Sequence, residues 1–197
     1  MNTKKLAFII MMGALGNVLF AISYFAGPIA PGIALDFSLI PVFIAGFFVG
    51  PAEGLFTGVL AGILPGIMFG PVGNGGWLGL IGLPLGKALT GLTAGLISKR
   101  LNMQKLPSSL LGIPLTLLAY VPEAIFTYAY FAFLLPLFIP GQFLGNAIII
   151  TILIKAVGEV IIMGAIIAAL IGNKGFNDFI KAYFQKPQVT QTTSATK

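Results

Sequence analysis

The sequence predicts an all-α membrane protein with six transmembrane helices and with its N- and C-termini in the cytoplasm. Three observations lead to this prediction: the scarcity of charge, the apolar stretches and the placement of the basic residues. Of the 197 residues, 57% are hydrophobic and 8% are charged, whereas a soluble domain carries about a quarter charged residues. So few charges cannot cover a surface in water, and most of the chain is therefore expected to face lipid.

Six apolar stretches are separated by segments rich in glycine and proline. A helix that spans the membrane needs about 20 mostly apolar residues. The second stretch is short, which leaves five helices with a re-entrant second segment as an alternative. The stretches run 6–26, 37–50, 52–69, 77–97, 110–135 and 142–171.

The basic residues favour an even number of helices. Six crossings from a cytoplasmic N-terminus leave the three outer loops without Lys or Arg, which is the pattern of cytoplasmic basic loops in membrane proteins. The net charge of +6 is thus interpreted as a topology signal of a multi-pass protein of the cell membrane and not as a nucleic-acid-binding surface. The cytoplasmic residues are Lys4, Lys5, Lys99, Arg100, Lys105, Lys174, Lys181, Lys186 and Lys197.

The chain is expected to form one domain. Residues 1–172 would make the six-helix transmembrane part and residues 173–197 a cytoplasmic tail. The first stretch is long for a signal peptide and is expected to be a retained helix. The residues after Phe184 are polar and lack an apolar period, so we expect them to be disordered.

Glycine recurs at every fourth position across the second and third stretches. Such a row lies near one face of a helix and lets another backbone approach closely. The row indicates either close packing inside this chain or a surface that slides against another membrane protein. Its members are Gly46, Gly50, Gly54, Gly58, Gly62, Gly66 and Gly70.

Several kinds of chemistry are excluded by absent residues. The chain has no cysteine and no histidine, which removes disulfides, the commonest transition-metal ligands and a His-based triad. It also lacks the G-x-x-x-x-G-K-[ST] phosphate-binding loop, so it does not hydrolyse ATP by that route. No enzyme activity, metal or cofactor is expected, and an intramembrane hydrolase is a distant alternative.

Four ionisable residues lie deep inside predicted helices: Lys87, Glu123, Lys155 and Glu159. A charge at a helix centre in lipid costs about 2.5–3.5 kcal/mol or more, so such residues face the interior of a bundle and form pairs. At about 1.5 Å per residue, all four fall in one layer roughly 15–21 Å below the outer surface. They indicate either salt bridges that fix the helix packing or a polar site for a small solute entering from outside.

Polar and aromatic residues gather at the predicted outer ends of the helices. Asn74, Trp77, Gln142 and Asn146 are expected to form the rim and lid of such a site. The aromatic residues there also suit an interfacial belt; they are Tyr24, Phe25, Tyr128, Tyr130 and Phe131. Asp36 precedes the second stretch and is expected to cap its helix.

One segment has a pattern that points to a family. Residues 34–63 read ALDFSLIPVFIAGFFVGPAEGLFTGVLAGI. They resemble the helix-two signature of the substrate-binding S components of energy-coupling factor (ECF) vitamin transporters, and the riboflavin-type branch is most similar. The matching positions are Leu35, Asp36, Ser38, Ile40, Pro41, Phe47, Gly50, Pro51 and Gly54.

The resemblance implies a six-helix protein with a solute pocket in its outer half. It also implies a protein without its own ATPase, which docks on a transmembrane coupling subunit driven by two ATP-binding-cassette ATPases. In this family an Ala-x-x-x-Ala face on helix one usually makes the docking contact. The residues at that spacing here are Gly13, Asn17 and Ala21.

Helix six of the riboflavin-type relatives carries an Asn three residues before a ligand-binding Lys. Lys155 matches that Lys, whereas Ile152 stands where the Asn would be. We therefore expect a membrane receptor for a vitamin or related small solute, with Lys155, Glu159, Lys87 and Glu123 at its site. Two alternatives remain, namely a stand-alone transporter or channel that relays protons or ions, and a structural subunit whose charges only hold helices together.

Overall fold

The fold is described from a computed structural model of the chain. It describes residues 2–26, 28–30, 33–73, 75–101, 111–139 and 146–184, with the backbone alone for 28–30, 33–34 and 146–147. The expected disordered end after Phe184 lies outside these residues.

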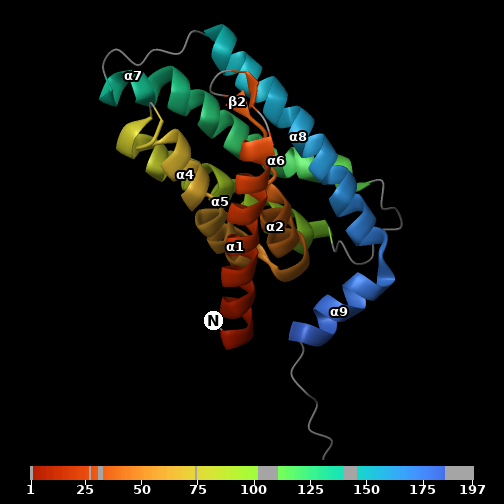
Figure 1. Ribbon diagram of the computed structural model, residues 1–197. Helices are drawn as coiled ribbons and strands as arrows, with labels where there is room; N and C mark the ends of the chain where they lie inside the picture. The colour runs from red at the N-terminus through yellow and green to blue at the C-terminus, as the bar shows by residue number, and fades with distance from the viewer. Residues whose placement is uncertain are drawn as a thin grey trace, which may run out of the picture.

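Helices make up nearly all of the described chain, which confirms the predicted fold class (Figure 1). β1 and β2 form a small antiparallel hairpin in which Pro28 lies opposite Ala34, and η1 and η4 are π-helical turns. The elements are α1 (Thr3–Ala26), β1 (Pro28–Ala30), β2 (Ile33–Ala34), α2 (Leu39–Ile44), η1 (Ala45–Val49), α3 (Pro51–Ala61), α4 (Ile63–Phe69), α5 (Gly76–Leu101), α6 (Gly112–Ala129), η4 (Tyr130–Leu134), α7 (Leu135–Phe138), α8 (Asn146–Gly172) and α9 (Lys174–Phe184).

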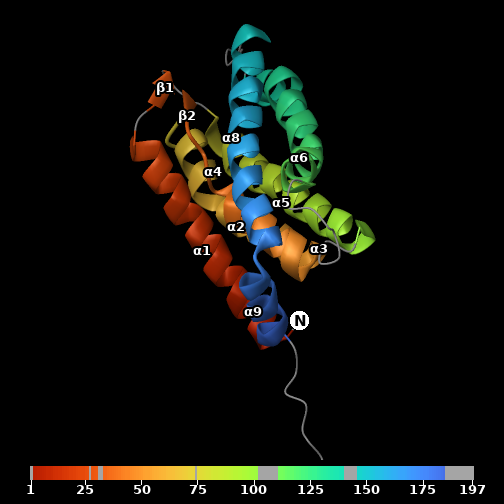
Figure 2. The ribbon, with the colours of Figure 1, turned by 90° about the vertical axis from the view of Figure 1, so that its right-hand side faces the viewer.

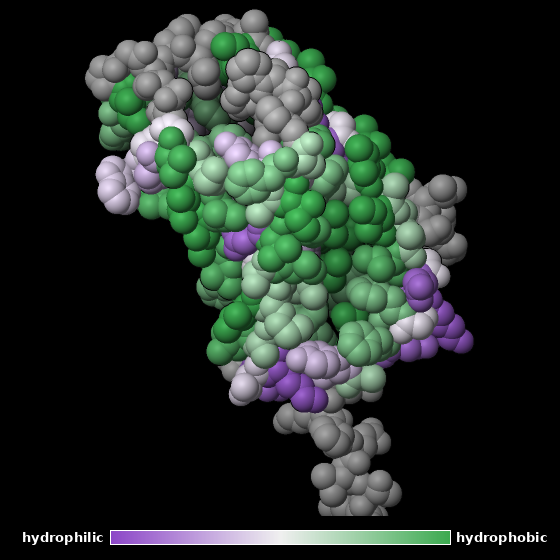
Figure 3. Space-filling model, in the orientation of Figure 1, coloured by the Kyte–Doolittle hydropathy of each residue, from purple (hydrophilic) through white to green (hydrophobic). Residues whose placement is uncertain are grey.

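The helices present apolar side chains to their surroundings, as a multi-pass membrane protein requires. Five described segments are long and apolar enough to cross a membrane: Thr3–Ala26, Pro51–Phe69, Gly76–Leu101, Gly112–Phe138 and Ile148–Gly172. Figure 3 shows one face of the molecule, where hydrophobic residues cover the middle and hydrophilic residues gather toward the lower end. The second predicted stretch contains only the shorter apolar helix Leu39–Val49, so a sixth span stays a prediction.

The break between the second and third predicted helices has a local cause. Gly50 has a φ of +151°, a backbone conformation that side chains with a Cβ rarely adopt. Pro51 follows in the first turn of α3, where its missing N–H costs no helical hydrogen bond. The chain therefore turns sharply between η1 and α3.

The glycine row packs inside the chain, against α5. A Cβ added to Gly54 would lie 2.2 Å from the carbonyl oxygen of Gly91, and one added to Gly58 would lie 2.4 Å from that of Lys87. The α3 and α5 backbones thus touch with no side chain between them, which favours the internal-packing interpretation. This contact also fixes the segment of α5 that carries Lys87.

Asn17 joins α1 to the junction between α3 and α4. Its amide nitrogen donates to the carbonyl oxygens of Gly13 and Leu60, at 3.0 and 2.9 Å. Its amide oxygen accepts the N–H of Leu64 at 2.9 Å. Leu64 lies in the first turn of α4, where the helix offers no acceptor of its own.

Replacing Asn17 with leucine should therefore lower the free energy of unfolding by about 1–3 kcal/mol, because buried polar groups lose their partner. Thermal unfolding of the purified protein in detergent, followed by circular dichroism, measures this. The neighbouring Val18 is exposed on α1, so Val18→Leu serves as the control and should leave unfolding unchanged. Equal stability of the two variants would show that the Asn17 contacts do not stabilise the fold.

The predicted cytoplasmic tail contains a helix that the sequence analysis did not anticipate. In α9, Phe176, Ile180, Tyr183 and Phe184 pack with Phe8 of α1 and Phe48 of η1. Figure 2 shows α9 beside the first turns of α1 from a second direction. Both ends of the described chain thus lie at the same end of the bundle (Figure 1). Which side of the membrane this end faces stays a prediction.

Candidate functional site

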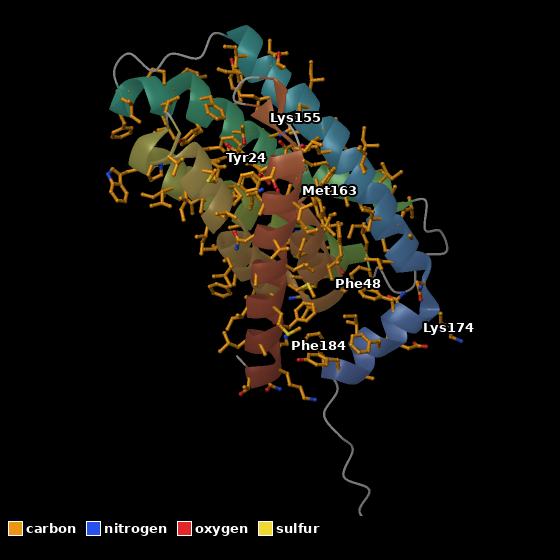
Figure 4. All side chains as sticks on the ribbon, viewed as in Figure 1. Tyr24, Phe48, Lys155, Met163, Lys174 and Phe184 are labelled. Carbon is orange, nitrogen blue, oxygen red and sulfur yellow. The ribbon has the colours of Figure 1, made fainter. Side chains whose placement is uncertain are left out.

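A cavity of about 460 Å³ lies toward the end of the bundle opposite the N-terminus. Its lining includes the end of α1 and the segment that precedes α2. Further lining residues belong to α4, α5, α6, η4 and α8. Figure 4 labels two of its lining residues, Tyr24 and Lys155, which lie toward that end, far from Phe184 of α9. The structure places all four deep ionisable residues predicted from the sequence, Lys87, Glu123, Lys155 and Glu159, around this single cavity.

Lys87 of α5 pairs with a residue that the sequence analysis had assigned elsewhere. Its ammonium nitrogen lies 2.6 Å from the Oδ2 atom of Asp36, and Lys87 is only 3% exposed. The expectation that Asp36 caps the second helix is wrong, because α2 begins at Leu39 with Ser38 at the cap position. The carboxylate of Asp36 instead accepts hydrogen bonds from the backbone N–H and the hydroxyl of Ser38, at 2.9 and 2.6 Å.

Asp36 lies outside the five candidate spans. Burial by itself disfavours the charged form of its carboxyl group, but the ammonium of Lys87 and the hydrogen bonds from Lys87 and Ser38 outweigh that effect. The ion pair and the hydrogen bonds therefore favour the charged form of this carboxyl group. Asp36 is a carboxylate in this cavity.

On α8, Lys155 and Glu159 form an ion pair one turn apart, at 3.2 Å. The same Oε1 atom of Glu159 also accepts the backbone N–H of Asp36 at 2.8 Å. Through Asp36, the ion pair on α8 is linked to Lys87 on α5. Three segments far apart in the sequence therefore share one polar network.

Glu123 of α6 has a hydroxyl group as its hydrogen-bond partner, and not a lysine. Its carboxylate accepts a hydrogen bond from the hydroxyl of Thr90 on α5. It forms no ion pair with a lysine or arginine in the described part of the chain. Among the described residues, no group of three acidic side chains lies close enough together to hold a metal ion.

Aromatic side chains form much of the remaining wall. The ring of Tyr130 lies 6.3 Å from that of Phe126, and the rings of Tyr24 and Phe69 are 6.0 Å apart. Tyr130 is 4% exposed, and its hydroxyl finds no hydrogen-bond partner among the described residues. Phe131 also lines the cavity, so three of the five outer aromatic residues take part in its wall.

The predicted rim is less well defined. Trp77 is 76% exposed and does not line the cavity. Asn74 and Gln142 lie outside the described residues, as does the side chain of Asn146, whose backbone begins α8. A role for these four residues in closing the cavity stays a prediction.

The predicted docking residues on α1 contact this chain itself. A Cβ on Gly13 would lie 2.4 Å from the Cβ of Leu60, and Asn17 is bonded to α3 and α4 as described above. Ala21 is half-buried. Gly13 is buried, whereas Asn17 is only partly buried. A docking role for Gly13, Asn17 and Ala21 stays a prediction. The open side of α1 carries Ile10, Met11, Val18 and Ile22.

The chain resembles a known protein in its three-dimensional structure. No family model and no curated protein matches the sequence. A solved structure described as "Structure and mechanism of the S component of a bacterial ECF transporter" aligns with a TM-score of 0.53 and 23% identity. The alignment covers 93% of this chain and 98% of that chain.

The chain has an S-component fold. The match extends over nearly all of both chains, so the fold likeness covers the whole bundle and not only the segment that resembles helix two. Lys155, which matches the Lys of the riboflavin-type pattern, and Ile152, which stands where that pattern has an Asn, both line the cavity.

Sequence reasoning missed several lining residues. Asp36 was assigned to a helix cap, although Lys87 in a buried position required a carboxylate partner. Tyr120 and Thr127 line the cavity beside Glu123, and their spacing on α6, three before and four after Glu123, places them near one face of that helix. That spacing was the signal available in the sequence.

Proposed function

We propose that this protein is the membrane substrate-binding subunit of an ECF-type transporter for a vitamin or related small solute. One observation carries the proposal: in a bundle with the S-component fold, five ionisable side chains from four segments line one cavity. Its volume of about 460 Å³ lies within the range of about 300–1,000 Å³ that small-molecule sites occupy.

The proposed site consists of Lys155, Glu159, Lys87 and Glu123, with Asp36 as the partner of Lys87. A purely structural set of ion pairs would need no empty volume beside it, whereas these groups border open space. Ile152 also lies at the cavity wall, in place of the Asn of riboflavin-type relatives. This supports a solute other than riboflavin.

Uptake would depend on a separate transmembrane coupling subunit with two ATP-binding-cassette ATPases. The cavity binds solute while it is open outward, and reorientation of the subunit weakens that binding. A partner moves this equilibrium only as far as its affinities for the two states differ. Residues Asn74, Trp77, Gln142 and Asn146 are proposed to close the outer mouth.

Lys155→Met should weaken solute binding about tenfold or more, because a hydrogen bond to a charged group is worth about 1.5–3 kcal/mol. The small molecule that copurifies with the wild-type protein would be extracted, identified by mass spectrometry and titrated into both proteins. The exposed Lys174 of α9 provides the matched control, Lys174→Met. Unchanged affinity in a folded Lys155→Met protein would remove Lys155 from the site.

Dependence on the ATPase module separates this function from its alternative. Cells that carry this chain together with a coupling subunit and its ATPases should accumulate the solute, and cells that carry this chain alone should not. Accumulation by the chain alone would favour a stand-alone transporter, in which the network from Lys155 to Lys87 relays protons or ions.

A further inference from the structure

The carboxyl and ammonium side chains around the cavity are unequal in number. Its lining contains three carboxyl side chains, those of Asp36, Glu123 and Glu159, and two ammonium side chains, those of Lys87 and Lys155. The pairs Lys87–Asp36 and Lys155–Glu159 account for two of each sign. Three minus two leaves one carboxyl group, and it is Glu123, whose hydrogen-bond partner among the described residues is the hydroxyl of Thr90.

Glu123 has no cation paired with it alone, although the charge of Lys87 also acts on it. An ionised carboxyl group at this depth is costly, since the surroundings solvate it poorly. An incoming cation would offset that cost, while an incoming anion would add to it. The cavity therefore favours a positively charged group beside Glu123.

A second polar group, close to the cavity wall, has no hydrogen-bond partner in the part of the chain that the structure describes. The hydroxyl of Tyr130 is buried and unbonded among the described residues, and Tyr130 lines the cavity. Buried hydroxyl groups in folded proteins nearly always have a hydrogen-bond partner. Because the hydroxyl itself is buried, Tyr130 would have to turn toward the cavity for a solute atom to supply one.

The two groups lie on one continuous run of helix. Tyr130 follows Glu123 by seven residues, and Thr127 lies between them at the cavity wall. Seven residues of helix advance by roughly 10 Å and two turns, so these side chains line one side of the helix. A solute lying along this row would meet Glu123 at one end and Tyr130 at the other.

The walls between these ends suit a flat ring. Phe126 and Phe131 line the cavity on the same run of helix, and Tyr24 and Phe69 line it from α1 and α4. Aromatic faces pack against flat rings and also attract organic cations.

We propose that the solute of this cavity is a flat aromatic cation, with a positively charged nitrogen group beside Glu123 and a hydrogen-bonding group near the Tyr130 hydroxyl. The proposal rests on the proposed function and specifies its substrate class.

Three naphthalene probes of one size test the charge preference. They carry a hydroxyl group at one end of the ring system and, at the other end, a methylammonium, a hydroxymethyl or a carboxylate group. Isothermal titration of the full chain in detergent should show the ammonium probe binding about tenfold or more tighter than the alcohol and the carboxylate, as expected for a charge-assisted contact.

Two pairs of variants locate the contacts. Glu123→Gln should abolish the preference for the ammonium probe, while Glu53→Gln, which removes a carboxylate paired with Lys5 near the N-terminal end, should retain it. Tyr130→Phe should weaken the ammonium probe about three- to tenfold and yet raise the melting temperature of the empty protein, because it deletes an unpaired buried hydroxyl. The exposed Tyr128 gives the control Tyr128→Phe, which should change neither value.

The proposal is overturned if the alcohol or carboxylate probe binds as tightly as the ammonium probe, if none of the three binds, or if Glu123→Gln keeps the preference. The proposed function fails separately. If the copurifying molecule is neutral or anionic and Lys155→Met abolishes its binding, the proposal of a cationic solute is refuted and the proposed receptor function is retained. Uptake without any ATPase partner would refute the proposed receptor function.

Discussion

Lys87→Met should lower the free energy of unfolding by about 3–5 kcal/mol, the cost of removing one partner from a buried ion pair. Lys87 is 3% exposed and lies 2.6 Å from the carboxylate of Asp36. Glu123 and Glu159 also lie close enough to interact with its charge. Without Lys87, the cavity would hold three carboxyl groups and one ammonium group.

Thermal unfolding in detergent measures this loss, and two further variants interpret it. Lys99 is exposed near the end of the same helix, so Lys99→Met should leave stability within about 0.5 kcal/mol of the wild type. Adding Asp36→Asn to Lys87→Met should recover part of the loss, because coupled partners are not additive. If Lys87→Met unfolds at the same temperature as Lys99→Met, the buried pair does not hold the bundle together.

Gly91→Ala should destabilise the protein by about 3 kcal/mol, at the upper end of the usual cost of overpacking. A Cβ on Gly91 would lie 2.1 Å from the carbonyl oxygen of Gly54. The obstacle is backbone, so no side chain can rotate away, and α3 and α5 must separate. Because Lys87 lies one turn before Gly91 on α5, the separation should also weaken solute binding.

A glycine in open surroundings provides the comparison. A Cβ on Gly158 of α8 would meet no atom within 4 Å, so Gly158→Ala should cost no stability. Both melting temperature and solute affinity are measured for the two variants. If Gly91→Ala retains both values, the α3–α5 contact is looser than described.

The sequence predicted most of the helices because lipid imposes a simple requirement on them. Every backbone polar group in lipid must be bonded internally, so long apolar runs become helices. The predicted stretch 77–97 corresponds to α5, Gly76–Leu101, and the stretch 110–135 corresponds to Gly112–Phe138.

Two features of the fold could not be predicted from this requirement alone. The residues of α9 were assigned to a cytoplasmic tail without a predicted helix, because 11 residues are too few to span a membrane. Its apolar residues at positions 176, 180, 183 and 184 follow the helical period, which was the available signal. The glycine row was found, but its partner strip on α5, with Pro84, Gly91 and Gly95, became apparent only in three dimensions.

For the site, the sequence identified which charges lie deep but not how they pair. The partners Asp36 and Lys87 are 51 residues apart, and no local pattern joins them. Four ionisable residues appeared to balance as two of each sign. Asp36 adds a third carboxyl group to that count.

The odd number of long spans draws attention to the segment before α2, residues 35–38. Five long spans are an odd number, yet α9 lies beside the start of α1, an arrangement that the predicted sixth crossing would explain. The helix Leu39–Val49 covers only about 16 Å of a hydrocarbon core of about 30 Å.

In a six-span topology, the non-helical residues 35–38 would make the rest of that crossing, because Ser38 lies against Gly16 near the middle of α1. Irregular backbone survives at such depth only where the protein itself satisfies its polar groups or where it borders a cavity. The carboxylate of Glu159 does so for the N–H of Asp36. Glu159, which we propose binds solute, would therefore also stabilise an unwound crossing, and its replacement should destabilise this segment of the chain.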